Sequence, residues 1–181
     1  CDFELWVGKN GCGWIRYAVQ AKKITPSSGR YNSLKHIVKS SKKLQMDVLE
    51  SYAIANRAFP IYCFYNITRP PPSVIKPWLN KYKWNCCQSH KEIQLGCSVT
   101  PLNVAKKAID EGARDLKTIH SNDQNLPWRC LVKCHPCEKA KVSINEVSGW
   151  GLLDECTYES LPPSLAKIIE TGSKDFSFDQ V

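Results

Sequence analysis

The chain has 181 residues, of which 43% are hydrophobic, a size and composition that suit one folded domain with a real core. No apolar run approaches the length of a membrane-spanning helix, so we do not expect a membrane protein. The formal net charge is +8, and residues 1–43 contain nine basic and two acidic residues, or +7 of that total. This concentration of positive charge predicts a polyanionic partner, most simply DNA. The alternative is a basic surface that is merely solvated.

The first elements expected along the chain are two strands joined by a glycine-rich turn. Residues 1–7 (CDFELWV) alternate between two faces, and Asp2 and Glu4 share one of them. Residues 8–13 form the turn, and residues 14–24 (WIRYAVQAKKI) form the second strand. We therefore expect an antiparallel hairpin at the start of the chain.

A helix and a buried strand are expected next. Residues 42–59 have apolar side chains at spacings of three and four, and Pro60 is expected to end this helix. Residues 60–66 (PIYCFYN) are a continuous apolar run, which is typical of a buried strand. Such a strand can lie parallel to the second strand through a standard crossover, which predicts an α/β fold with a mixed central sheet flanked by helices.

The sequence patterns that predict helices and strands are weaker in the later part of the chain. We expect a strand at 93–99, then a helix over 102–116 with Thr100 as its N-cap and Pro101 at its first position. A short helix is expected at 163–170. Residues 118–150 have no regular pattern, and residues 79–92 form a cysteine-containing insertion. In this interpretation residues 1–68 form the core, and residues 69–181 complete the same domain with a Cys-rich insertion or appendage.

Polar residues at the two strands of the hairpin suggest a site. Asp2 and Glu4 lie on one face of the first strand, and Gln20 and Lys22 lie on one face of the second. If the register aligns these faces, carboxylates meet an amide and an ammonium group. A carboxylate can hold Mg²⁺, which activates water and polarises a phosphoryl oxygen, and a lysine can offset charge on phosphorus. The alternative is an amphipathic hairpin whose polar face is simply solvated.

This arrangement resembles the PD-(D/E)XK nucleases, the restriction-endonuclease-like superfamily. Their pattern is an acidic residue on one strand, then (D/E)-x-K on the next, in a hairpin followed by a helix and a buried strand. Asp2 matches the first position, and Gln20-Ala21-Lys22 matches the second in the Q-x-K form of Mrr-like restriction enzymes. The resemblance covers about residues 1–66. It implies a restriction-endonuclease-like fold and an endonuclease that hydrolyses DNA with Mg²⁺ or Mn²⁺, in bacterial restriction or anti-phage defence.

Two positions depart from the family pattern. Cys1 stands where the motif has proline, and Gln20 replaces a carboxylate. The resemblance implies that Asp2 and Gln20 bind the metal, and Glu4, or an acidic residue ahead of Cys1, would have to supply the missing charge. The chain opens directly on a strand, so we expect that an element preceding the hairpin is absent.

Further residues are candidates for nucleic-acid contacts. In related folds a helix glutamine can approach the active centre, which makes Gln45 a candidate, with an ordinary solvated glutamine as the alternative. Basic side chains between the second strand and the helix could follow a phosphate backbone without reading its sequence. These residues are Lys23, Arg30, Lys35, Lys39, Lys42 and Lys43.

Ten cysteines form the second notable feature of the composition. An even number is compatible with a secreted disulfide framework. Cys63, however, lies inside an apolar run, where a free thiol behaves as a small hydrophobe. Because we also find no leader peptide, we expect a cytoplasmic protein with reduced thiols.

A structural zinc ion is a separate hypothesis. Cys134 and Cys137 have the C-x-x-C spacing of half a zinc site. The other half would come from among Cys86, Cys87, Cys97 and Cys130, and free thiols are the alternative. The rival to a nuclease is therefore a non-catalytic nucleic-acid-binding module or a zinc-stabilised interaction domain.

Overall fold

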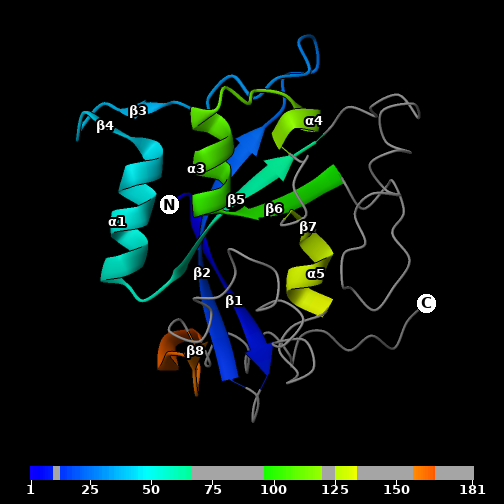
Figure 1. Cartoon of the computed structure of the whole chain (residues 1–181). Helices are drawn as coiled ribbons and strands as arrows, with labels where there is room; N and C mark the ends of the chain where they lie inside the picture. The colour runs from blue at the N-terminus through cyan, green and yellow to red at the C-terminus, as the bar shows by residue number, and fades with distance from the viewer. Residues whose placement is uncertain (10–12, 67–95, 120–124, 134–156, 166–181) are drawn as a thin grey trace.

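The structure is a computed structural model that describes residues 1–9, 13–66, 96–119, 125–133 and 157–165. Its centre is a mixed sheet whose main strands follow the order β1-β2-β5-β6-β7 (Figure 1). The pairs β1–β2, β5–β6 and β6–β7 are antiparallel, whereas β2–β5 is parallel. The strands are β1 Phe3–Lys9, β2 Gly13–Lys23, β5 Phe59–Tyr65, β6 Cys97–Pro101 and β7 Leu126–Pro127.

Strand β2 is longer than its neighbours and pairs with three other strands of the sheet. Its carboxyl-terminal part, from Tyr17 to Lys23, pairs with β5. Its first residues extend beyond β5, and Trp14 and Ile15 pair there with β8 (Thr157–Tyr158). The middle of β2, Tyr17, Ala18 and Val19, is apolar and buried, which explains why this strand can lie between two others.

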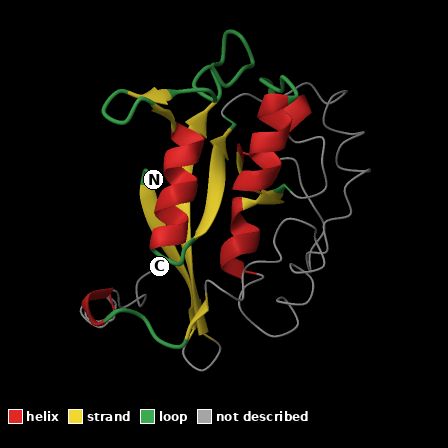
Figure 2. Ribbon diagram, turned by 60° about the vertical axis from the view of Figure 1, so that its left-hand side comes forward, coloured by secondary structure: helices red, strands yellow, loops and turns green. Residues whose placement is uncertain are grey.

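Helices cover the sheet on both faces. Helices α1 (Gln45–Ala55) and α3 (Leu102–Asp110) lie together over one face (Figures 1 and 2). Helix α5 (Trp128–Lys133) follows β7, and the Trp128 ring packs 6.3 Å from the ring of Phe3. Phe3 points away from the α1 face because its neighbour Glu4 contacts α1. The prediction of a mixed central sheet flanked by helices is confirmed.

The core lies between the sheet and these helices. Helix α1 buries Met46, Leu49 and Ala53 against β2 and β5, so its buried stripe shares only Leu49 with the residues whose spacing predicted the helix. Helix α3 buries a similar stripe against β5 and β6. A short helix, α4 (Leu116–Ile119), packs against α3. In the described residues, no helix is long and apolar enough to cross a membrane.

The first helix is shorter than its periodicity indicates. Residues Lys43–Leu44 form strand β4, which pairs with β3 (Ile37–Val38) in a separate two-stranded ribbon. The helix therefore begins at Gln45. It ends before Arg57, which has a left-handed backbone (φ 48°). Pro60 then lies inside β5, so the prediction that this proline ends the helix is wrong.

The second long helix also differs from its prediction. Thr100 is buried in β6 and donates its hydroxyl to Asn125, so it is a strand residue rather than an N-cap. The helix begins at Leu102 and ends at Asp110, before Gly112 takes a left-handed φ of 95°. Such a φ is favourable for glycine and ends a helix.

Other predictions fall partly or wholly outside the described residues. Residues 125–133 contain β7 and α5, so the expectation of irregular structure there is wrong. Of the helix expected at 163–170, residues 163–165 are helical and the remainder is outside the described residues. The strand expected at 93–99 is described only from 96 onward. The insertion at 79–92, with Cys86 and Cys87, and the zinc candidates Cys134 and Cys137 all lie outside the described residues.

Candidate active site at the end of the hairpin

The register of the hairpin places Asp2 beside Gln20. Phe3 pairs with Val19, and the Asp2 amide donates to the Val19 carbonyl at 2.8 Å. One carboxylate oxygen of Asp2, Oδ2, accepts hydrogen bonds from the Gln20 amide nitrogen and from the Ala21 backbone at 2.8 Å. The exposed carboxylate is therefore fixed against the Q-x-K segment of β2.

Lys22 lies next to this pair, on the same face of β2. Its side chain is only 3% exposed. The ammonium group donates to the Ser33 carbonyl at 2.8 Å and to Gln45 Oε1 at 2.5 Å. It also lies 5.8 Å from the centre of the Tyr62 ring, within the range of a cation–π contact. These contacts hold the cation in one position under α1.

Electrostatics at Lys22 differ from those of a surface lysine. Burial lowers the pKa of Lys22, and the negative charge of Asp2 opposes part of that shift. The Ser33 carbonyl and Gln45 Oε1 accept hydrogen bonds from this ammonium group, which has three N–H donors. An ammonium so enclosed has few alternative positions, which is the property a catalytic cation requires.

Gln45 joins the site because of how α1 begins. The ribbon β3–β4 leads straight into the helix, and the Gln45 amide donates to the His36 carbonyl at 2.8 Å. This places the first side chain of α1 over the end of β2, where it accepts from Lys22. The structure therefore brings together four of the residues predicted from the sequence: Asp2, Gln20, Lys22 and Gln45.

Oxygen atoms at the site are suitable for a hard divalent cation. Asp2 Oδ1 and Gln20 Oε1 accept no hydrogen bond from any residue that the structure describes, whereas Asp2 Oδ2 accepts from the Gln20 amide and from the Ala21 backbone. Mg²⁺ prefers such ligands and usually keeps several waters. No cluster of three or more His, Cys, Asp or Glu residues that could hold a metal occurs in the described residues. The site thus offers one carboxylate and one amide.

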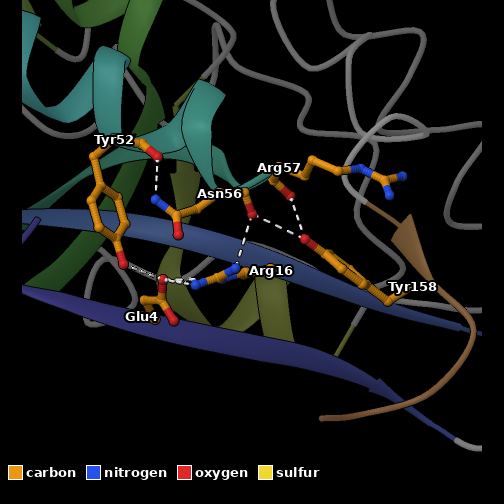
Figure 3. Close-up of polar contacts among 6 residues, drawn as sticks. All are labelled: Glu4, Arg16, Tyr52, Asn56, Arg57 and Tyr158. Atoms are coloured by element: carbon orange, nitrogen blue, oxygen red, sulfur yellow. Dashed lines mark hydrogen bonds and ion pairs between the residues drawn. The ribbon is translucent and has the colours of Figure 1, made fainter.

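Glu4 belongs to a different cluster, which Figure 3 shows. It lies two residues from Asp2 and therefore on the same face of the first strand. Glu4 Oε1 accepts from Arg16 at 3.0 and 2.6 Å and from the Tyr52 hydroxyl at 2.6 Å. Burial alone would raise the pKa of Glu4, but the hydrogen bonds from Arg16 and Tyr52 outweigh it and hold that pKa below its ordinary value. The structure therefore pairs the Glu4 carboxylate with Arg16 and does not bring it to the Asp2–Gln20 pair.

The rest of this cluster connects the hairpin to the end of α1 and to β8. Arg16 Nη1 donates to the Asn56 carbonyl at 2.9 Å. The Tyr158 hydroxyl lies 3.0 Å from that carbonyl and 3.1 Å from the carbonyl of Arg57, as Figure 3 shows. These contacts satisfy carbonyl groups at the end of a helix, so we interpret this cluster as structural.

The chain matches one family model, the Family of unknown function (DUF6615), over residues 1–177. The chain belongs to the DUF6615 family. No curated protein and no solved structure matches it. The matched range of the DUF6615 model includes the four clustered residues, but its description assigns no activity to them.

The six basic residues predicted to contact nucleic acid all have exposed side chains. They lie at the end of β2, in the following loop and on or beside the ribbon β3–β4. Figure 1 shows that ribbon next to the amino-terminal end of α1, the end that carries Gln45. None of the six forms an ion pair with another described residue. Their charges are therefore available to a ligand near the site.

Tyr62 is a residue of this site that sequence reasoning missed, since it lies inside an apolar run. In the register, Tyr62 is the β5 neighbour of Gln20. Burial raises the pKa of Tyr62, and the charges of Asp2 and Asp47 raise it further, so the phenol stays neutral. Its buried hydroxyl has no hydrogen-bond partner among the described residues.

Replacing Tyr62 by phenylalanine is expected to stabilise the fold by about 1 kcal/mol, because an unsatisfied buried hydroxyl is removed while the ring remains over Lys22. Urea denaturation measures the change. Tyr31→Phe is the matched control, since that hydroxyl donates to Asn66 and its loss should destabilise. A Tyr62→Phe protein that is less stable than the wild type would indicate that the Tyr62 hydroxyl has a hydrogen-bond partner.

Proposed function

We propose that this chain is a metal-dependent endonuclease that hydrolyses DNA phosphodiester bonds at a PD-(D/E)XK-type site in the Q-x-K variant. One observation carries the proposal. The hairpin register sets Asp2 against Gln20, and Lys22 lies next along the same face of β2 with its ammonium enclosed. A solvated amphipathic strand would not require a lysine 97% removed from solvent beside a carboxylate.

In this proposal each residue of the site has a separate role. Asp2 and Gln20 would hold Mg²⁺ or Mn²⁺ through oxygen atoms, and the bound ion would supply an activated water and polarise the phosphoryl group. Lys22, positioned by Gln45 and Ser33, stabilises negative charge that develops on the phosphate oxygens. The pKa of Lys22 is lowered by burial, so the proton of this cation is easier to release than that of a surface lysine.

The restriction-endonuclease-like fold is part of this proposal. Hairpin β1–β2, helix α1 and the parallel strand β5 follow one another in the order of that superfamily. A role in restriction or anti-phage defence rests on the resemblance alone.

A second candidate function is supported by the small number of carboxylates. With Gln20 in place of an acidic residue and Glu4 paired to Arg16, the site has one negative charge for a divalent cation. A chain of this kind could bind nucleic acid through its basic residues without cutting it.

Plasmid cleavage by the full chain separates the two candidates. Supercoiled plasmid is incubated with the protein in Mg²⁺, in Mn²⁺ and in EDTA, and the nicked and linear forms are quantified. Cleavage in either metal that stops in EDTA is the expected result. Folded protein that retards the plasmid on a gel but leaves it intact in both metals would favour the binding module and refute the nuclease.

The exposed lysines should act on affinity rather than on the chemical step. We expect Lys42→Asn with Lys43→Gln to weaken binding to all sequences and to reduce its salt dependence by up to about 0.9 in logarithmic slope per lost duplex contact. Asparagine suits position 42 because Lys42 has a left-handed φ of 54°. Fluorescence anisotropy at several salt concentrations, with Ca²⁺ replacing Mg²⁺, measures both quantities.

The matched control removes two charges elsewhere. Lys106→Ala with Lys107→Ala changes α3, where Lys106 pairs with Asp47 and Glu50. This double variant should keep the wild-type slope. Equal loss of affinity in both double variants would indicate a general effect of charge. It would contradict specific contacts between DNA and the basic residues beside the site.

A further inference from the structure

Two thiols meet on the face of the sheet opposite the candidate site. Cys63 on β5 and Cys97 on β6 have their Sγ atoms 3.4 Å apart and share a hydrogen bond. These strands are antiparallel neighbours, and Cys63 pairs in register with Val99, two residues from Cys97. Cys63 is also the register partner of Ala21, whose side chain points away from those of Gln20 and Lys22.

We propose that Cys63 and Cys97 form an oxidation site at which a peroxide generates a disulfide between β5 and β6. A disulfide bond is about 2.0 Å long, so the sulfur atoms need to approach by only about 1.4 Å. The two side chains already meet across hydrogen-bonded strands, and the contact between their sulfur atoms is the geometry that carries the proposal. This proposal does not depend on the nuclease function.

Two neighbouring thiols could also be zinc ligands. Zinc sites use three or four protein ligands. In the part of the chain that the structure describes, no third His, Cys, Asp or Glu joins these two thiols in a group that could hold a metal. Two thiols in contact are the two groups from which a disulfide bond forms.

The two cysteines have different roles. Cys63 is fully buried, whereas Cys97, the first residue of β6, is partly exposed and can meet a small oxidant. The hydrogen bond from Cys63 lowers the pKa of Cys97, with burial opposing it, and the same contact together with burial raises the pKa of Cys63. Cys97 is therefore the thiolate that reacts first.

The reaction balances with hydrogen peroxide as the oxidant. The Cys97 thiolate attacks one peroxide oxygen, the O–O bond breaks, and hydroxide leaves and takes up a proton to become water. Cys97 is now a sulfenic acid. The Cys63 sulfur then attacks the Cys97 sulfur, and a second water leaves with the Cys63 proton. Two thiols lose two electrons, peroxide gains them, and an external dithiol reverses the change.

The test is a map of the bridge in the full chain. Reduced protein is treated with hydrogen peroxide, alkylated, digested and analysed by mass spectrometry. We expect the peptides of Cys63 and Cys97 to be joined and to separate on reduction. Cys97 paired to a different cysteine, or overoxidised to sulfinic acid while Cys63 is alkylated as a free thiol, would overturn the proposal.

Variants give a second, independent readout. Cys63→Ala leaves Cys97 without its partner, so its sulfenic acid should persist and react with dimedone. Cys130→Ala, a buried cysteine on α5, is the control and should form the bridge at the wild-type rate. Circular dichroism verifies that each variant is folded. Folded Cys63→Ala protein that yields no more dimedone adduct at Cys97 than the wild type would refute the assigned order of reaction.

Discussion

Replacement of Lys22 by alanine is expected to lower single-turnover DNA cleavage by about 100- to 1000-fold, the usual effect of removing one group that stabilises transition-state charge. Affinity for DNA should change little, because the side chain is buried and would contact only the reacting phosphate. The measurement is single-turnover cleavage at saturating protein, beside equilibrium binding with Ca²⁺ in place of Mg²⁺.

Lys23→Ala is the matched control for this experiment. Lys23 is the next residue of β2, but its side chain is exposed. It is one of the six basic residues predicted to contact the phosphate backbone. This variant should lose affinity and keep its cleavage rate once DNA is bound. If Lys22→Ala also affects binding alone, then Lys22 is one more basic residue and the proposed chemistry is wrong.

Lys22→Met separates catalysis from folding. Because burial lowers the pKa of Lys22, the folded chain holds this proton less tightly than the unfolded chain does. Burial of the cation therefore costs stability at neutral pH, and the cost disappears as the pH rises from the folded toward the unfolded pKa. An apolar side chain of similar length removes this cost but leaves the Ser33 carbonyl and Gln45 Oε1 without their donor, so the net change in stability should be small. We expect Lys22→Met to remain folded, to lack cleavage activity and to lose this pH dependence in thermal denaturation.

Asp2→Asn is expected to abolish Mg²⁺-dependent cleavage, the second large effect. Asp2 is the carboxylate that contacts the Q-x-K segment, and the amide of asparagine is isosteric but carries no charge for the metal. Since Asp2 is exposed, the melting temperature should remain close to that of the wild type. Plasmid cleavage over a range of Mg²⁺ and Mn²⁺ concentrations tests the prediction, and wild-type cleavage by this variant would remove Asp2 from the proposed mechanism.

Glu4→Gln is the corresponding control on the same strand. It should leave Arg16 without its charged partner and lower the stability of the fold, while cleavage by the folded protein persists. The lowered pKa of Glu4 means that its contribution is present above the unfolded pKa and is lost as the pH falls through the folded pKa. Loss of cleavage in a stable Glu4→Gln protein would instead make Glu4 the second metal ligand suggested by the resemblance.

The hairpin and the buried strand β5 could be predicted from local pattern. Alternation in residues 1–7 and 14–24 has the period of a pleated strand, and the apolar run at 60–66 is too short and too continuous for an exposed element. Alternation also indicates that Gln20 and Lys22 share a face, since residues two apart in a strand always do. These statements depend on neighbouring residues only, and the sequence determined them by itself.

Element boundaries depended on contacts that local pattern does not include. Leu44 has the spacing of a helical residue, yet it pairs with Ile37 in a ribbon. Thr100 and Pro60 look like residues that begin or end a helix, yet each has a partner across the sheet: Thr100 pairs with Tyr62, and Pro60 with Ala18. Pairing with a neighbouring strand outweighs the weaker local preference.

Only the tertiary structure decided which polar groups meet. From the sequence, Asp2 and Glu4 are equivalent carboxylates on one face, but α1 places Tyr52 over Glu4 and Gln45 over Lys22. The contact between Cys63 and Cys97, 34 residues apart in the chain, likewise depends on the register of β5 and β6. A side chain's partner is set by how strands and helices are placed in space, whereas the sequence pattern specifies only the face on which it lies.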